Sequence, residues 1–348
     1  MDEDLHPTKR RIVEKKSLSD TKWVDLYTEM ITTVDETSEG LKGIVAEIFV
    51  NSDMLPETWE KNNCAIMGNM ITAVRNSYNG NKYHSFAHAC HVTLNCAKIL
   101  LDVAHQSPHI TRVEGLALLF AALIHDIGHL GVSNETLVNE NHELAMLYSD
   151  QSVAEMNSLA CAFQIINIPD QDIRCGMSAE ERKAFRTVVI DLVLSTNICD
   201  YDRQRLLQQR LDTAMKIVTS AGAIELSAYS SRLTIYNLII RAADVGASMQ
   251  NAETSRIWSH RFFLEQRDAL IAGRGPRVDG DDFCFQHGKF MERHAAALAN
   301  SLTSTGALSP SLSKEITDST SRNIAVWKIE GPAIVRAWCA ESPSTAIS

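Results

Sequence analysis

An apolar run from Leu116 to Ile124 leads directly into His125 and Asp126, and this junction constrains the fold more than any other stretch of the chain. Such a run predicts a buried helix, and an uncompensated charge at its end would be very costly. A bound cation is the simplest compensation. On a continuous helix His129 would share a face with His125, and Asp126 would lie about 100° round the axis. The junction therefore predicts a metal site, although these residues alone would bind an ion weakly.

The composition favours an aliphatic, helical core, because 45% of the 348 residues are hydrophobic but only 6% are aromatic. The net charge of -10 argues against binding of nucleic acid or of an anionic membrane through a basic face. None of the eight cysteines forms a CxxC pair, which favours reduced thiols. The N-terminus has no apolar signal core and no run reaches the length of a membrane span. We expect a soluble, cytoplasmic protein without direct membrane insertion, or a fragment of a longer one.

Helical periodicity dominates from Trp23 onward, with no strand-like alternation of any length, no internal repeat and no second hydrophobic core with its own linker. The expected fold class is all-α, as a single compact multi-helix domain. Residues 1–20 are charged and aperiodic, so we assign them to a flexible N-terminal lead or linker. The domain would span residues 21–340, with a C-terminal tail over residues 341–348.

Three histidines follow the turn expected at residues 79–81. His84, His88 and His91 would line one stripe of a long helix, at steps of four and three. Any one of them alone is more simply explained as a half-buried polar residue. As a set, followed by His125 and Asp126 on the next helix, they favour a metal site.

An aspartate far downstream offers the anionic ligand that this site lacks. Asp244 interrupts the apolar run Leu233–Val245, where a lone carboxylate is more often buried and hydrogen-bonded than bound to an ion. With His88, His125 and Asp126 it would supply two imidazoles and two carboxylates from three helices, a set that suits zinc. Asp126 could also bridge to a second, harder ion, magnesium or manganese. Two ions clamp the attacking and leaving oxygens of a phosphoester, so phosphoester cleavage is the predicted function.

Further motifs extend this candidate site. The element HDxxHxxxxN runs from His125 to Asn134 and is the most specific of them. The complete set is Tyr83, His84, His88, His125, Asp126, His129, Asn134, Glu155, Thr196, Ala243 and Asp244. These residues resemble the catalytic domain of class I cyclic nucleotide phosphodiesterases, within the HD superfamily of metal phosphohydrolases. The likeness runs from about residue 83 to residue 327, and its differences from the vertebrate branches suggest a protist source.

The resemblance implies an all-helical fold in which the cyclic phosphate lies over two divalent metal ions. The tighter ion, zinc, would be held by His88, His125, Asp126 and Asp244. The second ion, magnesium or else manganese, would share Asp126. The groups expected around its water molecules are His129, Glu155 and Thr196, with Asn134 of the motif beside them. On spacing alone, Glu155 would be explained equally well by its place near a positive helix end.

The resemblance also assigns the proton transfer. His84 would be the general acid that protonates the departing O3′ of the ribose, a role that suits a group titrating near neutrality. A bridging hydroxide would attack phosphorus in line and give the 5′-nucleotide. Tyr83, the neighbour of His84, is assigned to substrate binding.

The resemblance also implies a pocket for the purine base, but its residues match the family pattern less well than the metal ligands do. Gln286 resembles the family glutamine whose amide pairs with the purine edge, although an alternative register puts His287 in its place. Phe262 matches an apolar position that sandwiches the base; without the resemblance, core packing would explain it better. The aromatic residue usual three positions after the glutamine is here Lys289. Phe290 would therefore stack on the base only if the helix register shifts.

Other departures from the family pattern lie around the base and the second ion. Ala247 stands where many relatives have an asparagine near the base, which favours activity on both cAMP and cGMP. Asn157, Ser158 and Asn197 replace residues usual near the second ion. We therefore expect lower metal affinity with an intact set of ligands.

The expected function is that of a 3′,5′-cyclic nucleotide phosphodiesterase acting on cAMP, with cGMP as a second substrate. Two alternatives stay open: another HD-type phosphohydrolase acting on noncyclic nucleotides or polyphosphates, and a regulatory module that binds a cyclic nucleotide without cleaving it. The cyclic nucleotide is the partner expected, nucleic acid is not, and the sequence makes no prediction of oligomeric state.

Overall fold

The helix that ends at the His–Asp junction, α5 (Arg112–Ile124), is buried along almost its whole length. The computed structural model describes residues 22–33, 39–55, 63–274 and 280–341. Every residue of α5 from Glu114 to Ile124 is buried, and the hydroxyl of Thr111 caps its first turn by accepting the backbone N–H of Glu114. A helix that is apolar all round must be enclosed by other helices. The long helices α4 (Phe86–Gln106) and α9 (Ala179–Ser195) pack against it.

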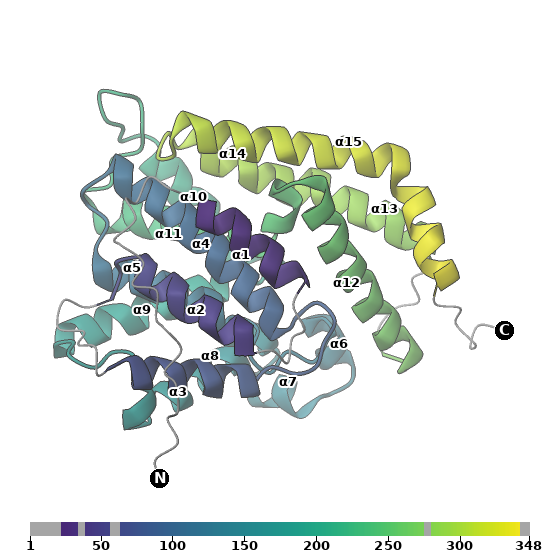
Figure 1. Ribbon diagram of the computed structural model, residues 1–348, viewed down its shortest axis with the longest axis horizontal. Coiled ribbons are helices and arrows are strands. Elements are labelled where there is room, and N and C mark those ends of the chain that lie inside the picture. Colours follow the sequence, from purple (N-terminus) through teal and green to yellow (C-terminus); the bar gives the residue numbers. More distant parts are fainter. Residues whose placement is uncertain (1–21, 34–38, 56–62, 275–279, 342–348) are drawn as a thin grey trace, which may run out of the picture.

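The remaining helices build outward from this centre (Figure 1). The α-helices are α1 (Lys22–Thr33), α2 (Glu39–Asn51), α3 (Cys64–Asn76), α6 (Asn134–Asn139), α7 (Glu143–Leu147), α8 (Val153–Ile166), α10 (Tyr201–Ala214), α11 (Tyr229–Asp244), α12 (Ala252–Ile271), α13 (Gly280–Phe290), α14 (Ala296–Ser304) and α15 (Pro310–Glu341). Short 3₁₀ segments cover Pro169–Gln171 and Gly246–Met249, and a π-helical turn, η4 (Met291–Ala295), joins α13 to α14.

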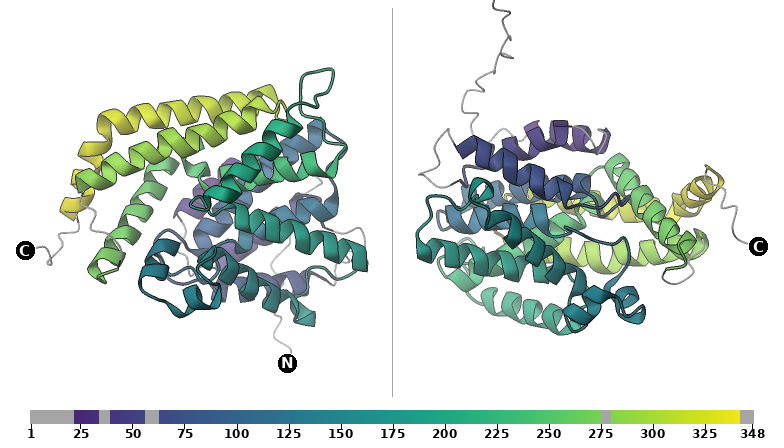
Figure 2. Two further views of the ribbon diagram at one scale, coloured as in Figure 1. Left: turned by 180° about the vertical axis from the view of Figure 1, so that it is seen from behind. Right: turned by 90° about the horizontal axis from the view of Figure 1, so that it is seen from below.

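The C-terminal helices form one edge of the molecule. In Figure 1, α14 and α15 run side by side along the top, and α12 descends from them toward the short helices α6 and α7. Figure 2 shows the same arrangement from behind and from below. The helices α1 and α2 lie against α4, and α11 also packs on α4. One region of the molecule therefore brings together four elements that are far apart in the sequence. They are the start of α4, the end of α5, the end of α11 and the middle of α12.

The two larger of three clusters of buried side chains hold most of the helices together. The largest one draws on helices from α1 to α15 and includes many residues of α4 and every residue of α5 from Leu116 to Ile124. A smaller, aromatic cluster joins α12, η4, α13 and α15; its buried members are Phe263, Phe283, Met291, Trp327, Val335 and Trp338. The sequence predicted no second core, because these aromatic residues are spread over three helices and only tertiary packing brings them together.

The predicted all-α fold class is confirmed. Within the part of the chain that the structure describes there is no strand, only an isolated bridge between Val218 and Ile224. No helix in that part is both long and apolar enough to cross a bilayer. The proposed N-terminal lead and C-terminal tail fall outside the described residues, except for Glu341, which is the last residue of α15.

Candidate metal centre and active site

The chain after α5 makes a turn rather than a further stretch of helix. α5 ends at Ile124, and His125 occupies its C-terminal cap. Gly128 has a φ of +72°, a conformation that favours glycine, and an added Cβ there would lie 2.8 Å from Asn157 Nδ2. The expectation that His125 and His129 share a helix face is therefore wrong. The turn brings His129 back toward the helix end by a different path, with its backbone N–H bonded to the Asp126 carbonyl.

The histidine stripe is also interrupted by a helix boundary. Ser85 has extended backbone angles and caps α4 by accepting the backbone N–H of His88, so α4 begins at Phe86 and His84 precedes it. His91 lies inside α4, but its Nε2 donates to Gln250 Oε1 at 2.9 Å and its ring stacks on Trp258. Of the three histidines, only His88 points from the helix into the candidate site.

Four side chains predicted as metal ligands converge at one point. His88 Nε2 lies 3.1 Å from Asp244 Oδ1 and 3.7 Å from Asp126 Oδ2. His125 Nε2 lies 3.2 Å from Asp126 Oδ2 and 3.4 Å from Asp244 Oδ1. The ligand atoms of His88, His125 and Asp244 all lie within 4.8 Å of one another. The four residues therefore form a possible metal-binding cluster, called here the His–Asp cluster.

Hydrogen bonding and charge in the His–Asp cluster suit a cation. His125 Nδ1 donates to the Ala122 carbonyl at 2.9 Å, so Nε2 faces the carboxylates, whose charges raise the pKa of His125 against the effect of burial. His125 Nε2 and Asp126 Oδ2 are buried without hydrogen-bond partners among the described residues. Burial raises the pKa of Asp126 and Asp244, but the neighbouring imidazoles outweigh burial and hold the pKa of each carboxyl group well below 3.8. Burial also lowers the pKa of His88, so the cluster combines a neutral imidazole with ionised carboxylates.

The ends of two helices add to the negative potential of the carboxylates in the His–Asp cluster. His125 and Asp126 follow directly on the C-terminal end of α5, and Asp244 is the last residue of α11. The C-terminal end of a helix carries a partial negative charge and stabilises nearby cations. The partial negative charges of two helix ends and the charges of two carboxylates therefore both favour a cation at the His–Asp cluster.

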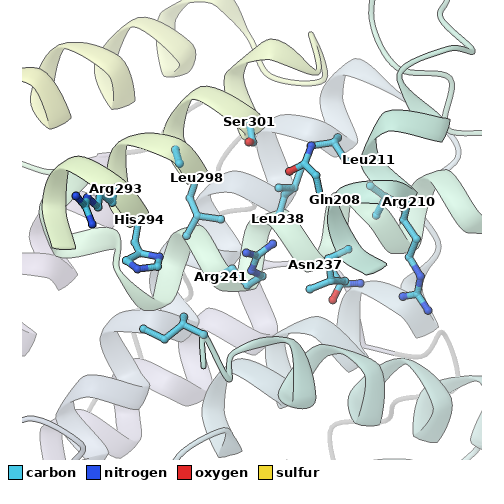
Figure 3. Close-up of a pocket in the computed structure, with 14 residues that line it drawn as sticks. Gln208, Arg210, Leu211, Asn237, Leu238, Arg241, Arg293, His294, Leu298 and Ser301 are labelled. Atoms are coloured by element: carbon cyan, nitrogen blue, oxygen red, sulfur yellow. The ribbon is translucent and has the colours of Figure 1, made fainter. Parts of the chain in front are cut away.

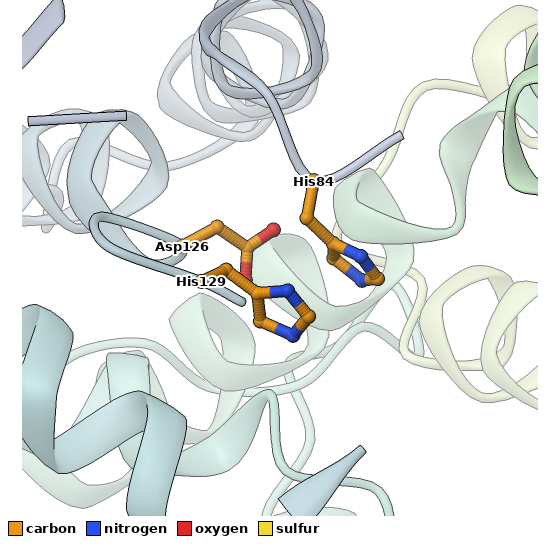
Figure 4. Close-up of side chains that lie close together, drawn as sticks. All are labelled: His84, Asp126 and His129. Carbon is orange, nitrogen blue, oxygen red and sulfur yellow. The ribbon is translucent and has the colours of Figure 1, made fainter. Parts of the chain in front are cut away.

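A second group of side chains lies beside the first. His84, Asp126 and His129 also come close enough to share an ion (Figure 4). The rings of His84 and His129 are stacked, with centroids 3.8 Å apart and planes inclined by 26°. His129 Nδ1 accepts the backbone N–H of Gly131, and burial together with the charge of His84 lowers the pKa of His129 to about 4. Asp126 belongs to both groups, as the predicted bridging role requires.

Glu265 of α12 is the acidic partner of His84. Its Oε1 contacts His84 Nδ1, and its Oε2 accepts the backbone N–H groups of Tyr83 and His84 at 2.8 and 2.9 Å. Burial lowers the pKa of His84, but Glu265 and Asp126 outweigh burial and raise it to about 9. Sequence reasoning missed Glu265, although its spacing from Trp258 and Phe262 on one helix face would have indicated a buried carboxylate.

Two asparagines fix the loop before α4 to the turn after α5. The side-chain amides of Asn79 and Asn81 both donate to the carbonyl oxygen of His129, at 2.8 and 2.7 Å. Asn81 also donates to the carbonyl oxygen of His84. The positions of the two stacked histidines are therefore linked through the backbone as well as through their rings.

The other predicted residues near the second ion lie around α8. Asn134 Nδ2 donates to Glu155 Oε2 at 2.9 Å, and Asn134 Oδ1 accepts the backbone N–H of Ala154. Burial raises the pKa of Glu155, which feels the charges of Asp126 and His125. Thr196 caps the end of α9, and its hydroxyl donates to the Val193 carbonyl.

Aromatic side chains line the region next to the cluster. Tyr83 lies between His88 and Phe262, with ring centroids 4.5 and 5.2 Å away. Phe262 and Phe290 each have ring centroids 6.3 Å from His287, which is buried. His287 Nε2 bonds Ser259 Oγ at 2.9 Å, whereas its Nδ1 is buried without a partner among the described residues.

Gln286 does not join this aromatic region. It is exposed, because adjacent residues of α13 lie about 100° apart round the helix and His287 takes the inward direction. His287, which the alternative register weighed from the sequence puts in the glutamine position, is the one of the two residues that is buried.

Comparison with known proteins agrees with this geometry. The family model for 3′5′-cyclic nucleotide phosphodiesterases matches residues 83–270, which include all four residues of the His–Asp cluster as well as His84 and Glu265. The chain belongs to this family. The match covers more than half of the sequence and lies within residues 83–327, where the motifs indicated the resemblance.

Individual relatives support the same assignment. The 3′,5′-cyclic-AMP phosphodiesterase 4C of Mus musculus is 31% identical over 255 residues, which cover 73% of this chain and 36% of the relative. The protein of the same name from Rattus norvegicus is 30% identical over 73% of this chain and 47% of its own length. The chain thus spans less than half the length of these curated relatives. The phosphodiesterase domain of a Salpingoeca rosetta rhodopsin phosphodiesterase has the same fold, with a TM-score of 0.71 and 22% identity over 90% of this chain and 96% of that one.

Proposed function

We propose that this chain hydrolyses 3′,5′-cyclic nucleotides to 5′-nucleotides, with cAMP as the first substrate and cGMP as the second. The observation that carries the proposal is His84, an imidazole with a raised pKa that is held by Glu265 beside the His–Asp cluster. The names of the mouse and rat relatives support cAMP as substrate.

The His–Asp cluster would hold the tighter metal ion, zinc, through His88, His125, Asp126 and Asp244. The donors fit, because two imidazoles and two carboxylates suit zinc, and the buried, unpartnered Nε2 of His125 and Oδ2 of Asp126 are available. A second ion, magnesium or manganese, would lie toward Asp126, with His129, Glu155 and Thr196 around its water molecules and Asn134 holding Glu155 in place. When bound, the two ions would supply positive charge over the phosphate and a nucleophile derived from water.

The chain itself would supply the proton for the leaving group. Glu265 contacts His84 Nδ1, so the other ring nitrogen, Nε2, carries the proton that would pass to O3′ of the ribose. The raised pKa keeps His84 protonated at neutral pH before the reaction. Before the transfer Glu265 is ionised, since the charge of His84 lowers its pKa against the effect of burial, to about 2. After the transfer His84 is neutral and would regain a proton from solvent.

We place the purine base against Phe262, with Tyr83 on the side of the cluster and Phe290 opposite Phe262. His287, rather than Gln286, would meet the edge of the base through its buried Nδ1. The hydroxyl of Ser259 can donate to or accept from His287 Nε2, so Nδ1 could either accept from the base or donate to it. This freedom supports activity on both adenine and guanine nucleotides.

The direct test measures release of 5′-AMP and 5′-GMP from the cyclic nucleotides, with Mg²⁺ or Mn²⁺ added to zinc-loaded protein. We expect the wild type to hydrolyse cAMP and the His84→Gln variant to lose this activity. Faster cleavage of noncyclic nucleotides would instead favour another HD-type phosphohydrolase. Tight binding of cAMP without turnover, equal in the wild type and in His84→Gln, would favour a regulatory binding module.

A further inference from the structure

A basic cavity lies away from the His–Asp cluster, between α10, α11 and the η4–α14 segment. Its volume is about 100 Å³, well above what one water molecule needs. Figure 3 shows Arg241 of α11 near its centre, with Arg293 and His294 on one side and Arg210 on the other. None of the described residues that line the cavity is acidic. In a chain with a net charge of -10, such a concentration of cations against the overall charge points to a ligand.

Arg241 is the least compensated of these cations. Its Nη2 donates to Gln204 Oε1, a neutral acceptor, and its Nε is buried without a partner among the described residues. Burial lowers the pKa of Arg241 to about 10, which reflects a guanidinium that no carboxylate stabilises. Arg210 differs, because both oxygens of Asp191 lie 3.1 Å from its Nη1.

Arg293, a cation, and His294, an imidazole, complete the lining of the cavity. Both are exposed at the mouth of the cavity, and neither has a carboxylate within ion-pair distance in the described part of the chain. The neighbouring Glu292 is engaged elsewhere, with Lys328 and Lys289. Burial, then Arg241 and Arg293, lower the pKa of His294, so the three groups share one electrostatic environment.

We propose that this cavity binds a phosphate group, through Arg241 at its base and Arg293 and His294 at its mouth. A guanidinium with a free N–H edge is the donor best matched to phosphate oxygens, because it can make two parallel hydrogen bonds. The phosphate could be inorganic or part of a nucleotide. Leu298 and the other apolar side chains of the lining would contact a ligand larger than free phosphate.

The cavity is connected to the active site by one side chain. Gln204 accepts from Arg241, and its Nε2 donates to the carbonyl oxygens of Ser195 and Asn197, the residues on either side of Thr196. Arg241 also lies one helical turn before Asp244 on α11. A ligand bound to Arg241 would therefore act on two segments that carry residues of the proposed metal site.

The test is a titration of the metal-loaded protein with inorganic phosphate at constant ionic strength, followed by NMR of ¹³C-labelled histidine rings. The His294 resonance is identified by its loss in His294→Gln. We expect a saturable shift of this resonance, with a higher pKa for His294 in the phosphate-bound protein. Removing one charged partner in Arg293→Gln should weaken phosphate binding at this site about tenfold or more.

Arg322→Gln is the matched control, because it removes the same charge from an exposed position of α15 that does not line the cavity. Arg241→Lys keeps the charge but loses the paired donors, and should also weaken binding. If Arg241→Lys does not fold, Arg293→Gln decides the question alone. The proposal is overturned if phosphate leaves the His294 resonance unmoved, or if Arg293→Gln and Arg322→Gln titrate alike.

The same spectra separate this site from the catalytic one. Binding at the proposed active site would move the resonances of His84 and His129, whereas binding in the cavity moves His294. A titration with 5′-AMP distinguishes the source of the phosphate: tighter binding than inorganic phosphate would identify a nucleotide, and equal binding would identify the phosphate group alone. The outcome for the cavity is independent of whether the chain hydrolyses cyclic nucleotides.

Discussion

Glu265 and His84 lie 181 residues apart in the sequence, yet one carboxylate both orients the imidazole and sets its charge. One oxygen of Glu265 accepts the backbone N–H of His84 at 2.9 Å, and the other contacts Nδ1 of the ring. The contact leaves Nε2 as the only ring nitrogen available for proton donation. It also overcomes the effect of burial, which alone would keep the imidazole neutral.

Glu265→Gln should move the pH dependence of turnover. The substitution removes the charge that raises the pKa of His84 to about 9, while burial continues to lower it. An acid catalyst works in its protonated form, so the limb along which kcat falls with rising pH should shift to lower pH in the variant. Steady-state kinetics of cAMP hydrolysis across the neutral and alkaline range would measure the shift. Glu253→Gln, at an exposed position of α12, is the control, and an unmoved limb would exclude Glu265 from this role.

His84→Gln should lower kcat by about 10²- to 10⁴-fold, the range expected when a general acid is lost. Binding of metal and of cyclic nucleotide should be largely retained, because His84 is not one of the four proposed ligands of the tighter ion. Turnover assays combined with metal analysis would separate the two effects. His105→Gln, which changes an exposed histidine at the end of α4, should leave both unchanged.

Asp244→Asn should weaken binding of the tighter ion by at least about tenfold, because it removes one of two anionic donors. Chelation of the wild-type protein should abolish turnover, and divalent ions should restore it. Metal content after dialysis against a competing chelator would be compared with that of Asp202→Asn, an exposed position on α10. Equal zinc retention in the two variants would contradict the assignment of Asp244.

His287→Ala should raise KM for cyclic nucleotides about five- to tenfold, the effect of losing one buried hydrogen bond. Gln286→Ala should have no such effect, since Gln286 is exposed. Competition kinetics with cAMP and cGMP would show the substrate preference of each variant. A larger effect of Gln286→Ala would restore the register in which the glutamine faces the base.

Glu114→Ala should destabilise the fold by about 3–5 kcal/mol, the usual result when one partner of a buried ion pair is removed. Glu114 accepts from Arg232 Nε and Nη2 at 2.7 and 3.0 Å and from the Tyr236 hydroxyl at 3.1 Å, so its loss leaves a guanidinium without its partner. Chemical denaturation would measure the free energy of unfolding. Glu180→Ala, at an exposed position in the first turn of α9, should change it by far less.

The residues that the sequence identified best are those with a strong local pattern. His125 and Asp126 stand at the end of an apolar run, and Asp244 interrupts another, so each is conspicuous without knowledge of the fold. Helix ends were harder to predict. The sequence suggested that His84 and His129 continue helical stripes, whereas α4 begins only after Ser85, and α5 ends at Ile124 before the turn that contains Gly128.

The relationships that could not be predicted depend on long-range packing. Glu265 meets His84, and Gln204 meets Arg241, only because α12 and α10 fold back on distant segments. The base pocket depends on the rotation of α13, where a change of one residue turns a side chain by about 100°. Neither composition nor periodicity determines such a rotation, and both His287 and Gln286 were compatible with the sequence.

The burial of α5 on all sides limits the substitutions that this helix can accept. A helix that touches others on every side tolerates few substitutions, because each alters packing that several neighbours share. Positions on α12 and α13 that we propose to face the base, such as Phe262 and Phe290, are only partly buried and have more room to vary. Substitutions at such positions of α12 and α13 should therefore disturb the packing less than substitutions in α5 beside the His–Asp junction.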